Sequence, residues 1–133
     1  MTDYLNPCME KDTVNAISVL GLAHIGDAVY ETCVRTYLCI HGHKAVSDLH
    51  ASTVKLVNAN AQAAASEIIV PLLSEEELAV YKRGRNAKVN SVPQHSSIAQ
   101  YHAATGVETL FGWLYLRGES TRINELFNAI MGE

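Results

Sequence analysis

The sequence has no stretch in which polar and apolar side chains alternate for long enough to form a β-strand. It also lacks a low-complexity segment, an internal repeat and an apolar leader of the secretory kind. The long apolar run over residues 19–40 is too polar in its middle to cross a membrane. With 133 residues, 48% of them hydrophobic, the chain can still bury a core of its own. We therefore expect an all-α protein with one domain over residues 1–133, its core spanning 12–131.

Cysteine is scarce, and its three residues are an odd number, which does not suit a framework of disulfides. Cys33 and Cys39 lie inside the same apolar run, where free thiols are typical of a core in a reducing compartment. The sequence therefore predicts a cytoplasmic protein without disulfides.

Catalytic fingerprints are missing as well. There is no Gly-x-Ser-x-Gly and no cysteine–histidine nucleophile pattern, and Gly84 and Gly106 form no phosphate-binding loop. The cluster Cys39, His41, His43 and His50 carries zinc-type ligands, but its spacing fits no standard zinc finger. Any chemistry must come from polar residues that stand alone on apolar helices.

The charge of the chain is unevenly distributed. A net charge of −4 gives no general indication of nucleic-acid binding. Between Glu77 and Glu108, however, there is no acidic residue, while four of the ten basic residues lie there. These are Lys82, Arg83, Arg85 and Lys88. This segment predicts a local basic patch on an acidic protein.

Caps and hydrophobic periodicity predict five to seven helices. Ser47 is a suitable N-cap for the second of them, Ser74 and Glu77 form a capping-box pattern, and Gly118 is suited to end the fourth. Residues 84–93 are rich in turn formers and are expected to form an exposed loop. The predicted helices span residues 12–40, with a break left open, then 48–70, 75–84, 97–117 and 121–131.

The first long helix carries one polar stripe, because His24, Asp27, Glu31 and Arg35 are three or four residues apart. A helix that is otherwise apolar should not bury carboxylates unless they are paired, bind a metal or face a cleft. Gly26 weakens a helix interior by about 1 kcal/mol relative to alanine, which suggests that something approaches the backbone there. An ion pair of Arg35 with Asp27 or Glu31 explains the stripe equally well.

Two further stripes follow the same rule. Glu108 is the one carboxylate of its helix and shares a stripe with His102, Thr105 and Gly112. On the predicted helix 48–70, the polar residues Lys55, Asn58, Gln62 and Ser66 share a face.

Asp27 and Glu108 meet in one cleft if their helices pack side by side. Two carboxylates with room for water suit Mg²⁺, whose coordination is completed by water and phosphate. A basic loop beside such an ion would hold a nucleic-acid backbone, as a nuclease requires. The alternative is that each acid is paired with a basic side chain.

Several segments resemble the ribonuclease III family. Ile-Gly-Asp-Ala-Val-Tyr-Glu at residues 25–31 resembles the signature helix of that family, whose pattern is leucine-glycine-aspartate-alanine-valine, and residues 107–116 resemble its second acidic helix. The similarity is greatest to the Mini-ribonuclease III branch, which lacks the double-stranded-RNA-binding domain. Segments that match this branch are residues 82–88, 92–93 and 105–108, and the whole resemblance spans about residues 18–117.

The resemblance implies a Mg²⁺-dependent endoribonuclease, with Mn²⁺ as a substitute ion, that cleaves double-stranded RNA as a homodimer. It further implies maturation of the large-subunit (23S) ribosomal RNA precursor, and it leaves open whether a ribosomal protein assists. By position, Asp27 and Glu108 would be the catalytic, metal-binding acids. Leu20 and Ala23 stand where ordinary ribonuclease III has further acids, and Thr105 replaces an aspartate as in the Mini branch. Glu31 is either a third metal-facing acid or, as we favour, the partner of Arg35.

The resemblance also suggests how RNA and a second copy would bind. Two antiparallel copies of the helix at residues 18–40 would form the dimer, with His24 at the contact. Duplex RNA would be held by its shape and phosphates. The side chains expected to hold it are Lys55, Asn58 and Gln62 on one wall and Arg85, Asn86 and Lys88 in the loop. The rival hypotheses are a catalytically inactive RNA-binding scaffold, favoured by the missing acids, and a helical protein-interaction domain.

Overall fold

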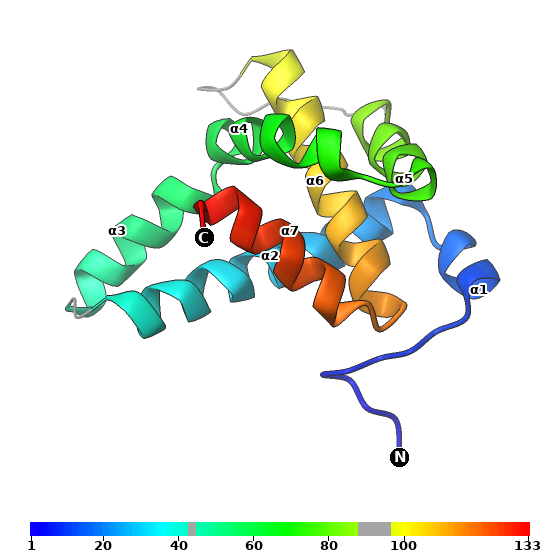
Figure 1. Ribbon diagram of the computed structural model, residues 1–133, viewed down its shortest axis with the longest axis horizontal. Helices are drawn as coiled ribbons and strands as arrows, with labels where there is room; N and C mark the ends of the chain where they lie inside the picture. The colour runs from blue at the N-terminus through cyan, green and yellow to red at the C-terminus, as the bar shows by residue number, and fades with distance from the viewer. Residues whose placement is uncertain (43–44, 88–96) are drawn as a thin grey trace.

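The computed structural model describes residues 1–42, 45–87 and 97–133, and in these ranges the chain forms seven α-helices, one short 3-10 helix and no strand (Figure 1). The all-α prediction is confirmed. Lys88 and most of the predicted loop lie outside the described residues. The elements are α1 (Lys11–Asn15), α2 (Val19–His41), α3 (Val46–Val57), α4 (Ala59–Ile69), η1 (Val70–Leu72), α5 (Glu75–Arg85), α6 (Ile98–Leu116) and α7 (Ser120–Met131).

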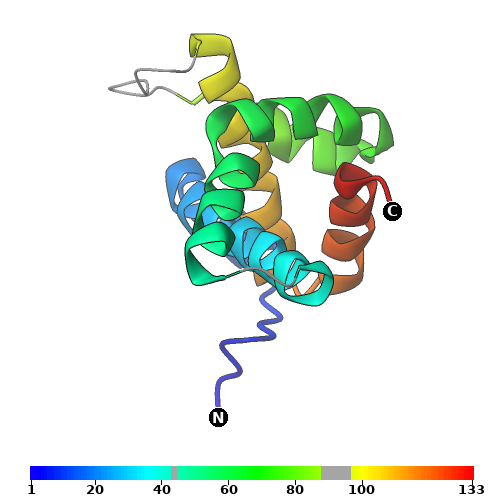
Figure 2. The same cartoon turned by 90° about the vertical axis from the view of Figure 1, so that its left-hand side faces the viewer.

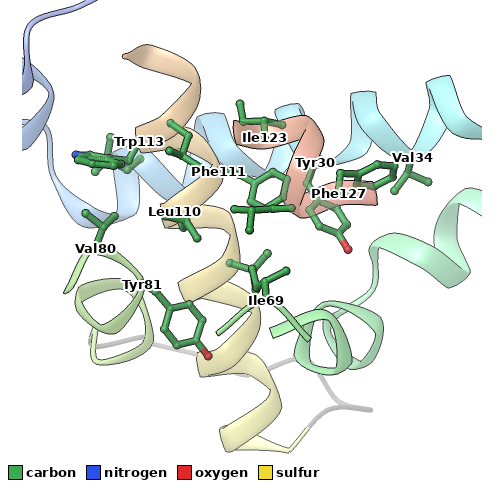
Figure 3. Packing of buried hydrophobic residues seen from close by; sticks show 14 of the residues in the cluster. Tyr30, Val34, Ile69, Val80, Tyr81, Leu110, Phe111, Trp113, Ile123 and Phe127 are labelled. Atoms are coloured by element: carbon green, nitrogen blue, oxygen red, sulfur yellow. The ribbon is translucent and has the colours of Figure 1, made fainter. Parts of the chain in front are cut away.

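Helix α6 is the centre of the fold and is covered by α2, α4 and α5, with α7 beside it (Figures 1 and 2). Its side chains Leu110, Phe111 and Trp113 are buried among residues of the surrounding helices (Figure 3). The helix begins at a capping box in which Ser97 accepts from the Gln100 amide and Gln100 accepts from the Ser97 amide. Gly118, at φ +78°, turns the chain after it as predicted.

Helices α2 and α6 touch backbone to backbone at a pair of glycines. A Cβ atom added to Gly26 would lie 1.6 Å from the carbonyl oxygen of Glu108, and one added to Gly112 would lie 2.0 Å from that of Leu22. No side chain fits in either position. The expectation that something approaches the backbone at Gly26 is therefore confirmed, and that neighbour is α6.

The predicted helix over residues 48–70 is wrong in one respect, because it is two helices. Asn58 has extended backbone angles (φ −69°, ψ 165°), and its side chain accepts from the Ala61 amide at 2.8 Å to cap α4. Asparagine is a strong N-cap residue, and here that property outweighs continuation of the helix. The first of the two also begins at Val46 after Ala45, so Ser47 is not its cap. The break left open in the first predicted helix falls between α1 and α2, where Ser18 caps α2.

Helix α5 begins at the predicted capping box of Ser74 and Glu77. The buried Glu77 carboxylate also accepts two hydrogen bonds from Arg122 of α7, each of 2.9 Å. Arg122 in turn donates to the Leu72 carbonyl and to Glu125. Burial raises the pKa of Glu77, but the hydrogen bonds from Arg122 and Ser74 outweigh burial and bring that pKa below its usual value. This ion pair therefore ties α7 to α5 and η1.

In the described parts of the chain, no helix combines the length and apolar character needed to cross a membrane. The single-domain boundaries of residues 1–133 stay a prediction.

Candidate active site

Helix α2 presents three different faces along its length. Leu22, Tyr30, Val34 and Leu38 form the buried face against the core. The predicted polar stripe of His24, Asp27, Glu31 and Arg35 forms a second, charged face, at or near the surface. A third face is exposed or half-buried and uncharged, and consists of Gly21, Ile25, Ala28, Thr32, Thr36 and Ile40.

Within the stripe, Arg35 is paired with Glu31 and not with Asp27. Its Nε and Nη2 atoms lie 3.0 and 2.9 Å from Oε2 of Glu31. This pair is largely exposed, so it adds little stability. The structure agrees with Glu31 as the structural partner of Arg35 and leaves Asp27 without that cation.

The carboxyl groups of Asp27 and Glu108 lie within hydrogen-bonding distance of each other. Burial, the hydrogen bond to Asp27 and the charge of Asp27 together raise the pKa of Glu108 from 4.5 to about 8. The pair therefore favours the protonated form of Glu108 near neutral pH, and in that form its hydroxyl can donate a hydrogen bond to Asp27. Among the described residues, no lysine, arginine or histidine forms an ion pair with either acid.

The glycine contact explains why these two acids meet. Asp27 follows Gly26 directly, and Glu108 is the residue whose carbonyl faces Gly26. Since the two backbones touch at this point, side chains that leave it in the same direction must be neighbours. The two acids are therefore neighbours because Gly26, which has no side chain, lets the backbones of α2 and α6 touch beside them.

The neighbouring positions considered in the sequence add no further metal ligand to the pair. Thr105 is buried, and its hydroxyl donates to the Tyr101 carbonyl at 3.0 Å, so this hydroxyl is directed to its own helix. Leu20 is exposed and Ala23 is buried, and neither offers a ligand. Across the described ranges, no group of three or more histidine, cysteine, aspartate or glutamate side chains is arranged to hold a metal ion.

The pair of Asp27 and Glu108 fits a hard divalent cation better than zinc. Two carboxylates provide oxygen ligands and negative charge, and Glu108 has an energetic reason to exchange its proton for a cation. Water and phosphate would have to complete the coordination. The zinc cluster is not supported, because His41 pairs with Glu133 at 3.1 Å and contacts Tyr37, while His43 lies outside the described residues.

The residues predicted to bind RNA on the first wall do not share a helix face. Lys55 is exposed near the end of α3, Asn58 caps α4, and Gln62 is only 2% exposed. The Gln62 amide nitrogen donates to the Val57 carbonyl at 2.9 Å, and its oxygen is buried without a partner. The expectation of one common stripe is wrong because of the break at Asn58. The RNA-binding role of these three residues stays a prediction.

The described part of the basic segment lies at the end of α5. Arg85 and Asn86 are exposed, and Arg85 Nε lies 3.4 Å from the Asn86 side-chain oxygen. A Cβ atom on Gly84 would collide with Thr109 and Gly106, so this end of α5 is held tightly against α6. Helix α6 also carries Glu108, and the basic residues are therefore fixed relative to the acids.

Two further features were not predicted. An open groove of about 530 Å³ is formed by residues of α4, η1 and α5, with Tyr81, Lys82 and Arg85 among its lining residues. His102, in the stripe of Glu108, has its Nδ1 atom buried without a hydrogen-bond partner. Neither feature has a local sequence signal, because both arise from packing between helices.

Comparison with known proteins gives a consistent result. Residues 20–119 match the ribonuclease III domain. The Mini-ribonuclease 3 of Symbiobacterium thermophilum is 44% identical over 110 residues, which cover 83% of this chain and 85% of that protein. That of Clostridium tetani is 40% identical over 129 residues, covering 96% and 85%. A crystal structure of a Fusobacterium nucleatum protein is similar with a TM-score of 0.81 at 28% identity, covering 90% of this chain and 95% of that one.

Proposed function

This chain belongs to the ribonuclease III family and is an endoribonuclease, and from that premise we propose that it cleaves double-stranded RNA with Mg²⁺ bound by Asp27 and Glu108. The family acts on double-stranded RNA, generally as a dimer, and generally depends on a divalent metal ion. The observation that carries the proposal is the pair of adjacent carboxylates without a cationic partner among the described residues.

In the proposed reaction, Asp27 and Glu108 would hold the ion, and Glu108 would have to release its proton to do so. Mg²⁺ bound there would act as a Lewis acid that activates a water molecule and stabilises the charge on the phosphodiester. The exposed side of Asp27 leaves room for the RNA phosphate. Attack of water on phosphorus breaks the P–O3′ bond, which leaves a 5′-phosphate on one fragment and a 3′-hydroxyl on the other. Mn²⁺ would substitute for Mg²⁺ because it prefers the same oxygen ligands.

We propose that Lys55, Arg85 and Asn86 contact the phosphates of the duplex, together with Lys88 outside the described residues. All three described side chains are exposed, as such contacts require. Asn58 and Gln62 would act indirectly, since the first caps α4 and the second is buried. We further propose a cytoplasmic role in maturing the precursor of large-subunit (23S) ribosomal RNA, which the resemblance to the Mini-ribonuclease III branch implies. Assistance by a ribosomal protein is a separate prediction.

The test is to incubate the purified protein with a long RNA duplex, in Mg²⁺ and in EDTA, and to size the products. We expect discrete fragments only with Mg²⁺, and none from Asp27→Asn. The matched control is Glu31→Gln, which removes an acid one turn along α2 that is paired with Arg35 and should leave cleavage intact. An intact duplex that still shifts on a native gel would instead support the inactive scaffold.

A further inference from the structure

Residues 1–10, named here the N-terminal arm, extend away from the helices in both views (Figures 1 and 2). The arm is nevertheless fixed to the body by hydrogen bonds. The Met9 amide donates to the Leu116 carbonyl at 2.8 Å, and the Tyr115 hydroxyl donates to the Tyr4 carbonyl. Asp3 accepts from the amides of Leu5 and Asn6 at 3.1 and 3.0 Å. The arm therefore has a defined shape although it contains no helix.

The arm presents its large apolar side chains to solvent. Tyr4 is 81% exposed and Leu5 is 83% exposed, and Met1 is fully exposed. Burying side chains of this size is worth about 1.5–3 kcal/mol each. A segment whose backbone is held in place while its apolar side chains are unburied is suited to a second surface.

The surface that would bury these side chains must be apolar. A groove of that kind lies beside the arm. Leu5 lines a cavity of about 330 Å³ whose other walls include Ile25, Ala28 and Thr32 of α2 and Ile123 of α7. A neighbouring cavity of about 230 Å³ shares Thr32 and continues the groove to Ile40 near the end of α2. The groove thus follows the uncharged face of α2.

The composition of this groove selects the kind of partner. Neither cavity is lined by a lysine or an arginine, and the second includes Glu133 with its partner His41, so the groove does not match the phosphates of RNA. A second copy of this chain offers both an apolar arm and the same uncharged face. In a two-fold dimer each contact occurs twice, so an arm on one copy that reaches the groove of the other is repeated in the opposite direction.

We propose that the N-terminal arm is a clasp between subunits: Tyr4 and Leu5 of each copy pack on the uncharged face of α2 of the other copy. This inference rests on the homodimer of the proposed function and adds the part of the chain that stabilises it. The arm thereby completes an interface that the helices alone leave partly unfilled.

The first test compares two double variants by sedimentation velocity over a range of concentrations. Tyr4→Ser/Leu5→Ser should raise the dimer dissociation constant at least about tenfold, because two apolar side chains lose their burial on each copy. The control, Ile68→Ser/Leu72→Ser, removes two exposed apolar side chains of α4 and η1 and should leave the constant unchanged. The arm side chains are exposed in the single chain, so the melting temperature of the dissociated protein should be the same as for wild type.

The second test places a photo-crosslinking residue on the arm, as Tyr4→p-benzoylphenylalanine. Irradiation should give covalent dimers, with the linked peptide in α2 or α7. Cross-links only within one chain, together with an unchanged dissociation constant, would overturn the clasp and leave the dimer standing. A wild-type protein that sediments as a monomer with duplex RNA bound would overturn the dimer and the clasp together.

Discussion

Glu77 of α5 and Glu108 of α6 are both largely shielded from water, but their neighbours differ. The Glu77 carboxylate accepts two hydrogen bonds from Arg122 and one from the Ser74 backbone amide, and the pKa of Glu77 is lowered. Glu108 faces another acid, and burial together with Asp27 raises its pKa to about 8. The fold can thus neutralise a shielded carboxylate with a well-placed arginine. Leaving two acids together costs stability, and such an arrangement is typical of a site that a cation completes.

The largest expected effect is on catalysis. Glu108→Gln should reduce cleavage of duplex RNA by about 10³-fold, because the ion loses one of its two protein carboxylates. The matched variant Glu77→Gln should cleave normally per folded molecule, measured at 20 °C. Equal losses in the two variants would show that both acids are structural and would remove the distinction between them.

The next effect is on stability. Arg122→Ala should lower the free energy of unfolding by about 2–3 kcal/mol, because the shielded Glu77 carboxylate is left without its partner. Urea unfolding measures this loss. The double variant Glu77→Gln/Arg122→Ala should lose less than the sum of the two single variants, and strict additivity would mean that the pair is not coupled.

The smallest effect is the pH dependence of the metal-free protein. Since the pKa of Glu108 is about 8 when folded and 4.5 is its ordinary value, the folded state keeps a proton that the unfolded chain has lost between these values. Stability from this group is therefore full below about pH 4.5 and declines until about pH 8. Glu77 acts in the opposite sense, since its lowered pKa stabilises the fold above pH 4.5 and this contribution is lost in acid.

Melting temperatures in EDTA from pH 5 to pH 9 test this sign. In Glu108→Gln this decline of stability with pH should be absent. The free energy of unfolding of the variant relative to wild type should therefore rise by about 1–2 kcal/mol from pH 5 to pH 9. Contributions from all other groups are common to the two proteins and cancel in the difference. A difference that is flat with pH would mean that Glu108 is ionised in the metal-free protein.

The comparison also separates what local sequence predicts from what only packing determines. The capping boxes at Ser74 and Ser97 and the turn at Gly118 act within a few residues, and the helix ends they mark were predicted closely. Asn58 was placed inside a helix, because its polar side chain fitted the spacing of a surface stripe as well as it fits a cap. Its capping role depends on the turn between α3 and α4, which periodicity does not show.

For the site, the sequence predicted two isolated acids that meet in one cleft if their helices pack side by side, with a glycine beside one of them. The resemblance to ribonuclease III added the expectation that both acids bind the metal. The burial of Gln62 and the partner of Gly26 were not predicted. Both depend on which helices pack together, and a single sequence holds no direct record of that.

The contact of Gly26 with α6 has a mechanical consequence. Two rigid helices that touch at one crossing point can move relative to each other mainly by rotation about that point. His41 lies about 22 Å along α2 from Gly26, so a turn of about 5° displaces it by about 2 Å. Asp27 and the backbone of Glu108 lie beside this crossing point and would move by only a small fraction of that distance. Any turn of the two helices about this contact would therefore change the spacing of the acids far less than the positions of the helix ends.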